Sequence, residues 1–239
     1  MAEEEIVKHT KKIYKTWFNK ELSIWHKISE FLIEIIIIVF AVTISIWFHN
    51  LSEHKHQQKE VKQFLGGLKS DLCQDINEMN NDKQSFLKQQ RIFTYLVKLR
   101  KSEKPNKDTI NAYNSWLFNI TALNPNDGRF QGFKSSGKIG TIENKELQND
   151  IMDLYEEDIP ALLTSTSAYN SYKLKLFDLI FKNDKRLTDS TDNMIETLNT
   201  DEIFNLSRVL CNPVQVLERY ENCIQLMNKI IGEIDREYK

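Results

Sequence analysis

An almost unbroken apolar stretch near the N-terminus constrains the fold more than any other feature of this chain. Residues 31–48 read FLIEIIIIVFAVTISIWF, and Glu34 is the one charged residue among them. With its flanks, from Ile28 to Leu51, the stretch covers about 24 residues, or roughly 36 Å of helix, which is enough to cross a hydrocarbon core of ~30 Å. A buried core helix would rarely be apolar around its whole circumference. The stretch is therefore predicted to be a single transmembrane helix.

Two tryptophans and the lack of a cleavage site indicate that this helix stays in the mature protein. Trp25 precedes the apolar run and Trp47 lies near its end, where aromatic side chains meet the two membrane interfaces. No small-x-small cleavage site follows the run, and a long polar segment precedes it. We therefore expect an uncleaved signal anchor.

The lysines on the two sides of the span predict its orientation. Six lysines precede the span, and a similar length of chain after it holds four. Because lysine is retained on the cytoplasmic side, a cytoplasmic N-terminus is favoured. The chain then divides into a cytoplasmic amphipathic segment (1–27), a transmembrane helix (28–51) and an extracytoplasmic helical domain (52–239). In a Gram-negative bacterium this domain would be periplasmic.

The segment before the span has the pattern of a helix that lies in the membrane interface. Between residues 6 and 28, apolar side chains recur at intervals of three, four or seven, and lysines lie mainly between them. The same pattern would suit a helix that docks onto a cytoplasmic partner, so both interpretations stay open.

Glu34 is the residue of the span that needs an explanation. It lies one to two turns inside the apolar run, where a carboxylate is costly unless water or a partner stabilises it. One interpretation is that it reaches the cytoplasmic interface beside Glu30 and Lys27. The other is a contact with another helix, in an oligomer or with the span of a partner protein.

The composition favours long helices and argues against several classes of protein. Gly (7) and Pro (4) are scarce, so a loop-rich β-sandwich or a glycine-dependent nucleotide fold is not expected. The 32 basic and 34 acidic side chains nearly balance, whereas nucleic-acid-binding proteins usually carry a basic surplus. Cys73, Cys211 and Cys223 form no CxxC pair, which argues against zinc or thioredoxin-type chemistry. Whether they form a disulfide is left open.

Beyond the span, an apolar stripe predicts one long helix. From Val61 to Val97 the apolar residues fall at three- and four-residue steps, and the helix could be continuous with the span. It is expected to end near Lys104-Pro105. Gly66-Gly67 interrupts the stripe and marks either a hinge or a close contact with another helix.

Turn signals divide the middle of the chain. A second helix is predicted from Asp108 to Leu123, where Asn124-Pro125-Asn126-Asp127-Gly128 breaks it. After a glycine-containing connector, Asn144 can cap a third helix, which Pro160 should kink or divide before it resumes through Ile180. The polar residues 183–193 are predicted to form a loop.

The last helix has the clearest pattern. Asn212 is a good N-cap and Pro213 suits the first helical position. The apolar stripe that follows predicts either packing into the bundle of the chain itself or a coiled-coil seam between subunits. Its members are Leu217, Tyr220, Ile224, Met227, Ile231, Ile234 and Tyr238.

Two patterns resemble known functional motifs without matching them fully. Residues 132–138 nearly spell a phosphate-binding loop, but Ile139 stands where Ser or Thr would hold magnesium, and no apolar strand precedes it. A helix C-terminus at Gly137 explains the glycine more simply. His49, Glu53 and His56 share one helix face beside the span and could bind a metal, but a solvated juxtamembrane face is the preferred explanation. No GxSxG motif or paired carboxylate arrangement indicates a catalytic site, so we predict no catalytic, cofactor-binding or metal-binding residues.

Two stretches together resemble an uncharacterised bacterial family of small single-span membrane proteins, known as a domain of unknown function. The first stretch is Glu30-Phe-Leu-Ile-Glu34 with Trp47-Phe-His-Asn50 beyond the apolar segment. The second contains Phe130-Gln-Gly-Phe-Lys-Ser-Ser-Gly137, then Ile142-Glu-Asn-Lys-Glu-Leu147 and Leu154-Tyr155. The family has the same order of an acidic anchor helix, a Lys-Ser-Ser-Gly turn and a helix that ends in paired aromatic residues.

The resemblance spans most of the chain and departs from the family at two positions. Glu156 follows Tyr155 where a second aromatic residue is typical, and Gly132 replaces a more usual acidic residue. The shared motifs are structural, so the resemblance implies no activity. It implies a bacterial inner-membrane protein with its helical domain outside the cytoplasm.

Taken together, these patterns predict an all-α protein with an interfacial helix, one transmembrane helix and an extracytoplasmic helical bundle. The expected function is scaffolding or interaction within a membrane complex, without catalysis, cofactor or nucleic acid. The expected partners are the lipid bilayer and either another protein or further copies of the chain. One alternative is a ligand-sensing bundle that signals through the span to a separate partner, and another is a metal-dependent enzyme.

Overall fold

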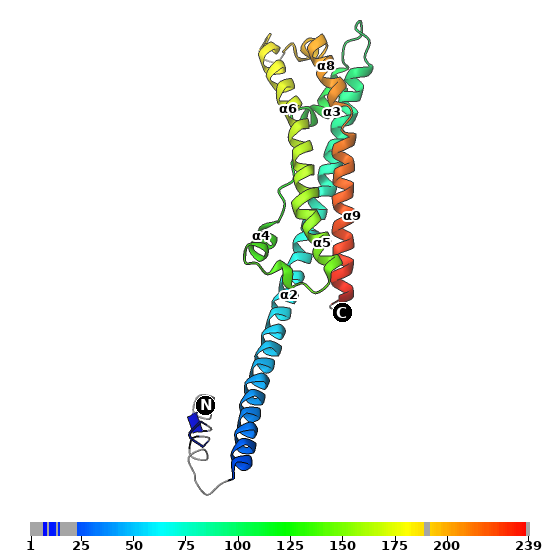
Figure 1. Cartoon of the computed structure of the whole chain (residues 1–239). Helices are drawn as coiled ribbons and strands as arrows, with labels where there is room; N and C mark the ends of the chain where they lie inside the picture. The colour runs from blue at the N-terminus through cyan, green and yellow to red at the C-terminus, as the bar shows by residue number, and fades with distance from the viewer. Residues whose placement is uncertain (1–6, 9, 13, 15–22, 189–191, 238–239) are drawn as a thin grey trace. The chain divides into compact units, whose positions relative to one another are not determined.

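The computed structural model describes residues 7–8, 10–12, 14, 23–188 and 192–237 (Figure 1). These residues are predominantly helical, and the β pairing among them is an isolated bridge between Arg186 and Asp192. The predicted all-α fold is confirmed. Two compact units divide the chain, residues 1–60 and residues 61–239. Residues 6, 9, 13 and 15–22 of the predicted interfacial helix lie outside the described residues.

Helix α2 (Ile24–Lys98, 75 residues) contains both the predicted span and the long stripe that follows it, without a break. Within the described residues it is the helix that is long and apolar enough to cross a membrane. The predicted end near Lys104-Pro105 is wrong, because the helix ends at Lys98. The N–H of Arg100 donates to the carboxylate of Glu103 at 3.2 Å, so a local turn replaces the next helical hydrogen bond.

The core of the second unit lies between α2, α6 (Ile159–Asn183) and α9 (Val214–Glu237). Phe86 of α2 meets an aromatic ring of each partner helix, Tyr169 of α6 with centroids 5.3 Å apart and Tyr220 of α9 at 5.8 Å. Polar contacts join the same helices, since the hydroxyl of Tyr220 donates to Asp82 at 2.8 Å. The apolar stripe of α2 is thus buried in a bundle formed by its own chain. Its buried members include Val61, Leu65, Leu68, Leu72, Met79, Phe86 and Phe93.

Helix α3 (Lys107–Phe118) is shorter than its predicted range, which ended at Leu123. Its start is set by Asn106, whose side chain accepts the N–H of Thr109 at 3.0 Å. Its end is held by Lys173 of α6, which donates to the carbonyls of Trp116 and Asn119. These carbonyls have no partner within the helix, so a long-range side chain, absent from the local pattern, ends α3 five residues early.

A helix that the sequence did not predict, α4 (Gly128–Ser135), occupies the expected connector. Gly137 follows its C-terminus and has a φ of 74°. The N–H of Gly137 donates to Lys134 at 2.9 Å and the N–H of Lys138 donates to Phe133 at 3.2 Å. This pair of bonds is a Schellman C-cap, which favours glycine at the left-handed position. The predicted helix C-terminus at Gly137 is therefore confirmed.

A 3₁₀ turn, η1 (Ile139–Thr141), leads to α5 (Lys145–Asp153), a π-helical turn η2 (Leu154–Asp158) and α6. The Asn144 cap is confirmed, because its side chain accepts the N–H of Leu147 at 3.1 Å. The division at Pro160 is also confirmed, since the π turn ends just before the proline at the start of α6. Proline lacks an N–H donor, and the i→i−5 pattern accommodates this loss.

The C-terminal part contains two helices that the sequence did not predict, α7 (Met194–Leu198) and α8 (Asp201–Leu210). The predicted capping by Asn212 is wrong: α9 begins at Val214, and the carbonyl of Pro213 accepts the N–H of Leu217 at 3.0 Å. Asn212 belongs to the end of α8, because its N–H donates to Val209 at 3.3 Å. All three cysteines are free thiols, and Cys223 is buried.

Candidate functional site

Glu34 is buried within the first unit, with 2% of its surface exposed. Its Oε1 lies 3.0 Å from the ammonium of Lys12. Neither interpretation from the sequence included this lysine. An ion pair lowers the cost of a carboxylate inside an apolar segment, so the contact gives Glu34 a partner in its own chain.

The apolar stripe of α9 faces the interior of the second unit. Tyr220, Ile224, Met227 and Ile234 are buried in its core, and Leu217 and Ile231 are partly buried against it. Tyr238, the last member of the stripe, lies outside the described residues.

The histidines beside the span form separate pairs. His49 lies 3.8 Å from Glu53, and His56 lies 4.0 Å from Glu60. Both histidine side chains are largely exposed, and the group of three possible metal ligands found among the described residues lies elsewhere.

The glycine-rich segment is mostly helix. Gly132 and Phe133 lie within α4, where their backbone groups take part in helical bonding, and Gly137 belongs to the C-cap. A phosphate-binding loop needs several free N–H groups directed at one point. The arrangement in α4 therefore lacks the geometry of that motif.

Three carboxylates converge where α5 packs against α9. Glu146 and Asp150 are one turn apart on α5, and Glu233 approaches from the last turns of α9. One oxygen from each side chain lies within 4.8 Å of the other two. We call Glu146, Asp150 and Glu233 the carboxylate triad.

The ammonium of Lys229 lies at the centre of the carboxylate triad. It is 2.7 Å from Asp150, 2.9 Å from Glu146 and 3.7 Å from Glu233. Arg236 approaches Glu233 from the next turn of α9, at 3.9 Å. Lys229 is half-exposed, so its ammonium remains within reach of solvent. The triad is an arrangement that holds a cation, and Lys229 supplies one.

Burial distinguishes the three carboxylates. Only 5% of the Glu233 side chain is exposed, and its Oε2 accepts no hydrogen bond from the described residues. Burial, followed by the charge of Asp150, raises the pKa of Glu233. Hydrogen bonding to Lys229 instead lowers the pKa of the exposed Glu146. Glu233 is thus the carboxylate whose charge is least stabilised by its surroundings.

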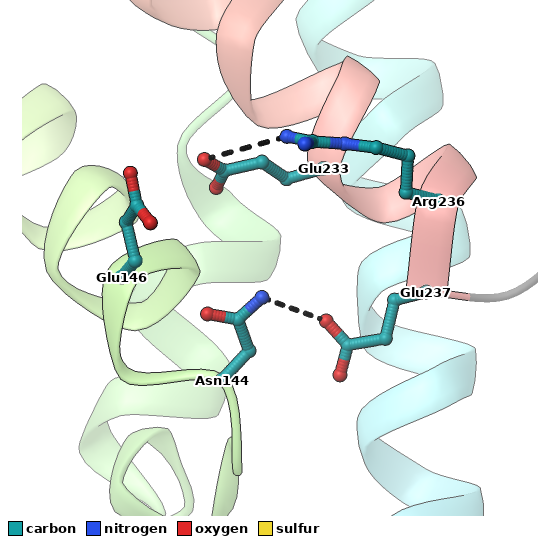
Figure 2. A pocket seen from close by; sticks show the side chains of 5 residues that line it. All are labelled: Asn144, Glu146, Glu233, Arg236 and Glu237. Atoms are coloured by element: carbon teal, nitrogen blue, oxygen red, sulfur yellow. Dashed lines mark hydrogen bonds and ion pairs between the residues drawn. The ribbon is translucent and has the colours of Figure 1, made fainter.

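A cavity of about 330 Å³ opens beside the triad, lined by Asn144, Glu146, Glu233, Arg236 and Glu237. Figure 2 shows the carboxylates of Glu146 and Glu233 facing one another across it. The side-chain amide of Asn144 donates to Glu237 at 3.1 Å and joins the N-terminus of α5 to the end of α9. The lining is rich in carboxylate oxygens, which suits the binding of a hard cation or an ammonium group.

The sequence contained weak signals of this site. Glu146 and Asp150 are four residues apart on one helix, and so are Lys229 and Glu233. Such spacing is common on solvated helix surfaces, where it adds little stability. The convergence depends on α5 packing against α9, which the local pattern does not contain.

A second buried polar group lies around Lys173, whose side chain is fully buried. Its ammonium donates to Gln89 Oε1 at 2.9 Å, to the carbonyl of Trp116 at 3.0 Å and to that of Asn119. The described residues place no carboxylate in ion-pair range of it. Burial lowers the pKa of Lys173 to about 7, whereas the three acceptor oxygens favour the protonated form. Its contacts indicate a structural role as the C-terminal cap of α3.

Comparison of the chain with protein-family models, with curated proteins and with solved structures finds no match.

Proposed function

We propose that this chain is a membrane-anchored interaction protein. In this proposal the apolar part of α2 holds the chain in the membrane, and residues 61–239 bind a partner protein without chemistry of their own. The lysine excess before the span supports a cytoplasmic N-terminus. A bacterial inner membrane is part of the proposal, as in the family that the sequence resembles. The second unit would then lie outside the cytoplasm.

A partly exposed apolar patch on the second unit carries this proposal. Phe118 of α3 stacks on Phe181 of α6, with ring centroids 5.6 Å apart, and lies 5.4 Å from Phe177. Phe181 is 68% exposed and Leu174, on the same side of α6, is 53% exposed. Phe118 and Phe177 are half-buried and pack against the core beside these exposed side chains. Apolar side chains exposed on a folded unit are typical of protein interaction sites. We call Phe118, Leu174, Phe177 and Phe181 the aromatic patch.

Site-specific photo-crosslinking in native membranes tests the proposal. A photoreactive phenylalanine at Phe181 should give a discrete crosslinked product, because the partner covers the patch. The same residue at Lys175, which is exposed on another side of α6, is the matched control and should give little product. The mass of the product separates a second copy of the chain from a different partner. Equal and diffuse crosslinking at both positions would refute the proposal.

Ligand sensing is the second candidate function, and the cavity lined by Glu146 and Glu233 is the observation that favours it. A sensor would transmit occupancy of this cavity through α2 to a separate cytoplasmic partner. Its test is a ligand-dependent change in the labelling of a cysteine placed before the span.

A further inference from the structure

We propose that the carboxylate triad is a binding site for a divalent cation of the calcium class, for which Lys229 acts as a built-in competitor. This inference is independent of the proposed interaction function. It rests on the geometry of the triad, on the bonding of Glu233 and on the position of Lys229.

The spacing of the oxygens suits calcium. Ca²⁺ binds oxygen ligands at about 2.3–2.6 Å, so ligands on opposite sides of the ion lie at most about 5 Å apart. One oxygen each from Glu146, Asp150 and Glu233 lies within 4.8 Å of the others, so small shifts of the side chains would bring all three into contact with one ion. Mg²⁺ requires shorter distances of about 2.0–2.1 Å and near-octahedral geometry, so the triad fits it less well.

Glu233 provides a second observation that points to a ligand. Its side chain is buried, its Oε2 accepts no hydrogen bond from the described residues, and its nearest cation is 3.7 Å away. It faces Glu146 across the cavity (Figure 2). A buried carboxylate oxygen without a donor costs free energy, and a metal ion in contact with it would remove that cost.

Lys229 explains how the site could open. Its ammonium approaches two of the carboxylates closely, at 2.7 and 2.9 Å, and therefore fills the position of the metal ion. Because the side chain is half-exposed, it can turn toward solvent when a divalent ion enters. A cation at this point would join α5 to α9 with stronger bonds than the ammonium forms. We expect a dissociation constant in the range of ~10⁻⁴–10⁻³ M, as in extracellular calcium modules.

The test is a titration of the full chain in detergent with calcium. Isothermal calorimetry measures the binding of the ion, and the melting temperature measures its effect on stability. Wild type should bind one Ca²⁺ and melt at a higher temperature with CaCl2 than with NaCl of equal ionic strength. Lys229→Met should tighten binding by about tenfold or more, because it removes a positive charge from the site. Glu233→Gln should weaken binding by a similar factor.

Two matched variants control for charge and for folding. Lys83→Met and Glu221→Gln break the ion pair between α2 and α9 outside the triad and should bind calcium as wild type does. Circular dichroism establishes that each variant is folded. If neither wild type nor Lys229→Met binds Ca²⁺ above the NaCl control, the triad is an ion-pair network and the inference is wrong. Equal binding by wild type, Lys229→Met and Glu233→Gln would place the ion elsewhere and also overturn it.

Discussion

The ring of Phe130 lies flat against the ring of Tyr155, with centroids 4.5 Å apart and 11° between the planes. This contact joins α4 to the π turn before α6. It is reinforced by an ion pair of 2.7 Å between Lys134 and Glu156. Three residues further along α4, Phe133 stacks on Phe64 of α2 with centroids 4.0 Å apart. The Phe-Lys-Ser-Ser-Gly segment therefore belongs to a helix that connects α2 to α6.

Truncation of Phe130 should destabilise the second unit. Residues 58–239 contain a core of their own, and we expect them to be soluble and helical when expressed alone. In this fragment Phe130→Ala should lower the free energy of unfolding by about 3–5 kcal/mol, because the ring is fully buried. Urea unfolding followed by circular dichroism measures the change. Phe181→Ala is the control and should cost less than ~1 kcal/mol. An unchanged midpoint for Phe130→Ala would contradict the packing of α4.

Gly66 and Gly67 should respond differently to alanine. A Cβ on Gly66 meets no atom within 4 Å, so Gly66→Ala should stabilise α2 by about 0.5–1 kcal/mol. A Cβ on Gly67 would lie 2.4 Å from the guanidinium of Arg129, which pairs with Asp71 at 2.7 Å. Gly67→Ala must displace Arg129, and the lost ion pair should cancel most of the helical gain. Urea unfolding of both variants checks this order, and greater stability of Gly67→Ala would contradict the close contact.

Lys173 should make stability depend on pH. Its pKa is about 7 in the folded state and near 10.4 when unfolded, so the unfolded state binds more protons between these values. The free energy of unfolding should therefore rise with pH above about 7, by up to ~1.4 kcal/mol per unit. Below pH 7 both states are protonated and the contribution of Lys173 is constant.

The comparison with Lys173→Met isolates this effect. Between pH 7 and pH 9 the cysteine thiols of the unfolded chain also ionise, since their ordinary pKa is about 8.5. Both proteins contain the same three free cysteines, so this contribution cancels in the difference between them. The free energy of unfolding of wild type minus that of Lys173→Met should rise with pH. A difference that does not change with pH would mean that Lys173 stays protonated when folded. The variant also leaves the carbonyls of Trp116 and Asn119 without their donor, so we expect the C-terminus of α3 to exchange its amide hydrogens faster.

Two variants test whether Glu34 acts through its ion pair with Lys12 or through a direct contact with another chain. If the pair supports assembly, Glu34→Leu and Lys12→Met should insert normally and change co-purification in mild detergent to the same extent. A partner helix that binds Glu34 directly would make Glu34→Leu alone lose the partner. Affinity purification of wild type and both variants, with quantified partners, distinguishes these outcomes.

The sequence patterns predicted correctly the elements that depend on residues close together in the chain. The apolar stripe of α2, the Asn144 cap and the glycine C-cap at Gly137 each follow from residues close together in the chain. The early end of α3 did not, because Lys173 reaches its carbonyls from more than fifty positions away. Helix α4 was missed for a similar reason, since its short polar sequence is stabilised by stacking on α2 and on the π turn.

The candidate site also depends on contacts between residues far apart in the chain. The sequence predicted no metal-binding residues, because Glu146, Asp150 and Glu233 carry no motif and come together through the packing of α5 on α9. Helical spacing at Glu146 and Asp150 is compatible with an ordinary solvated surface. The burial of Glu233 separates this cluster from other charged faces, and burial follows from tertiary structure.

Labelling of single cysteines in intact spheroplasts tests the central claim of a membrane anchor with an external helical unit most directly. In a chain with Cys73, Cys211 and Cys223 replaced by serine, a cysteine at Ser70 should react with a membrane-impermeant maleimide. A cysteine at Thr10 should react only after the membrane is permeabilised, and both variants should resist carbonate extraction. Labelling at Thr10 with protection at Ser70 would invert the orientation. Release of the chain by carbonate would contradict the anchor itself.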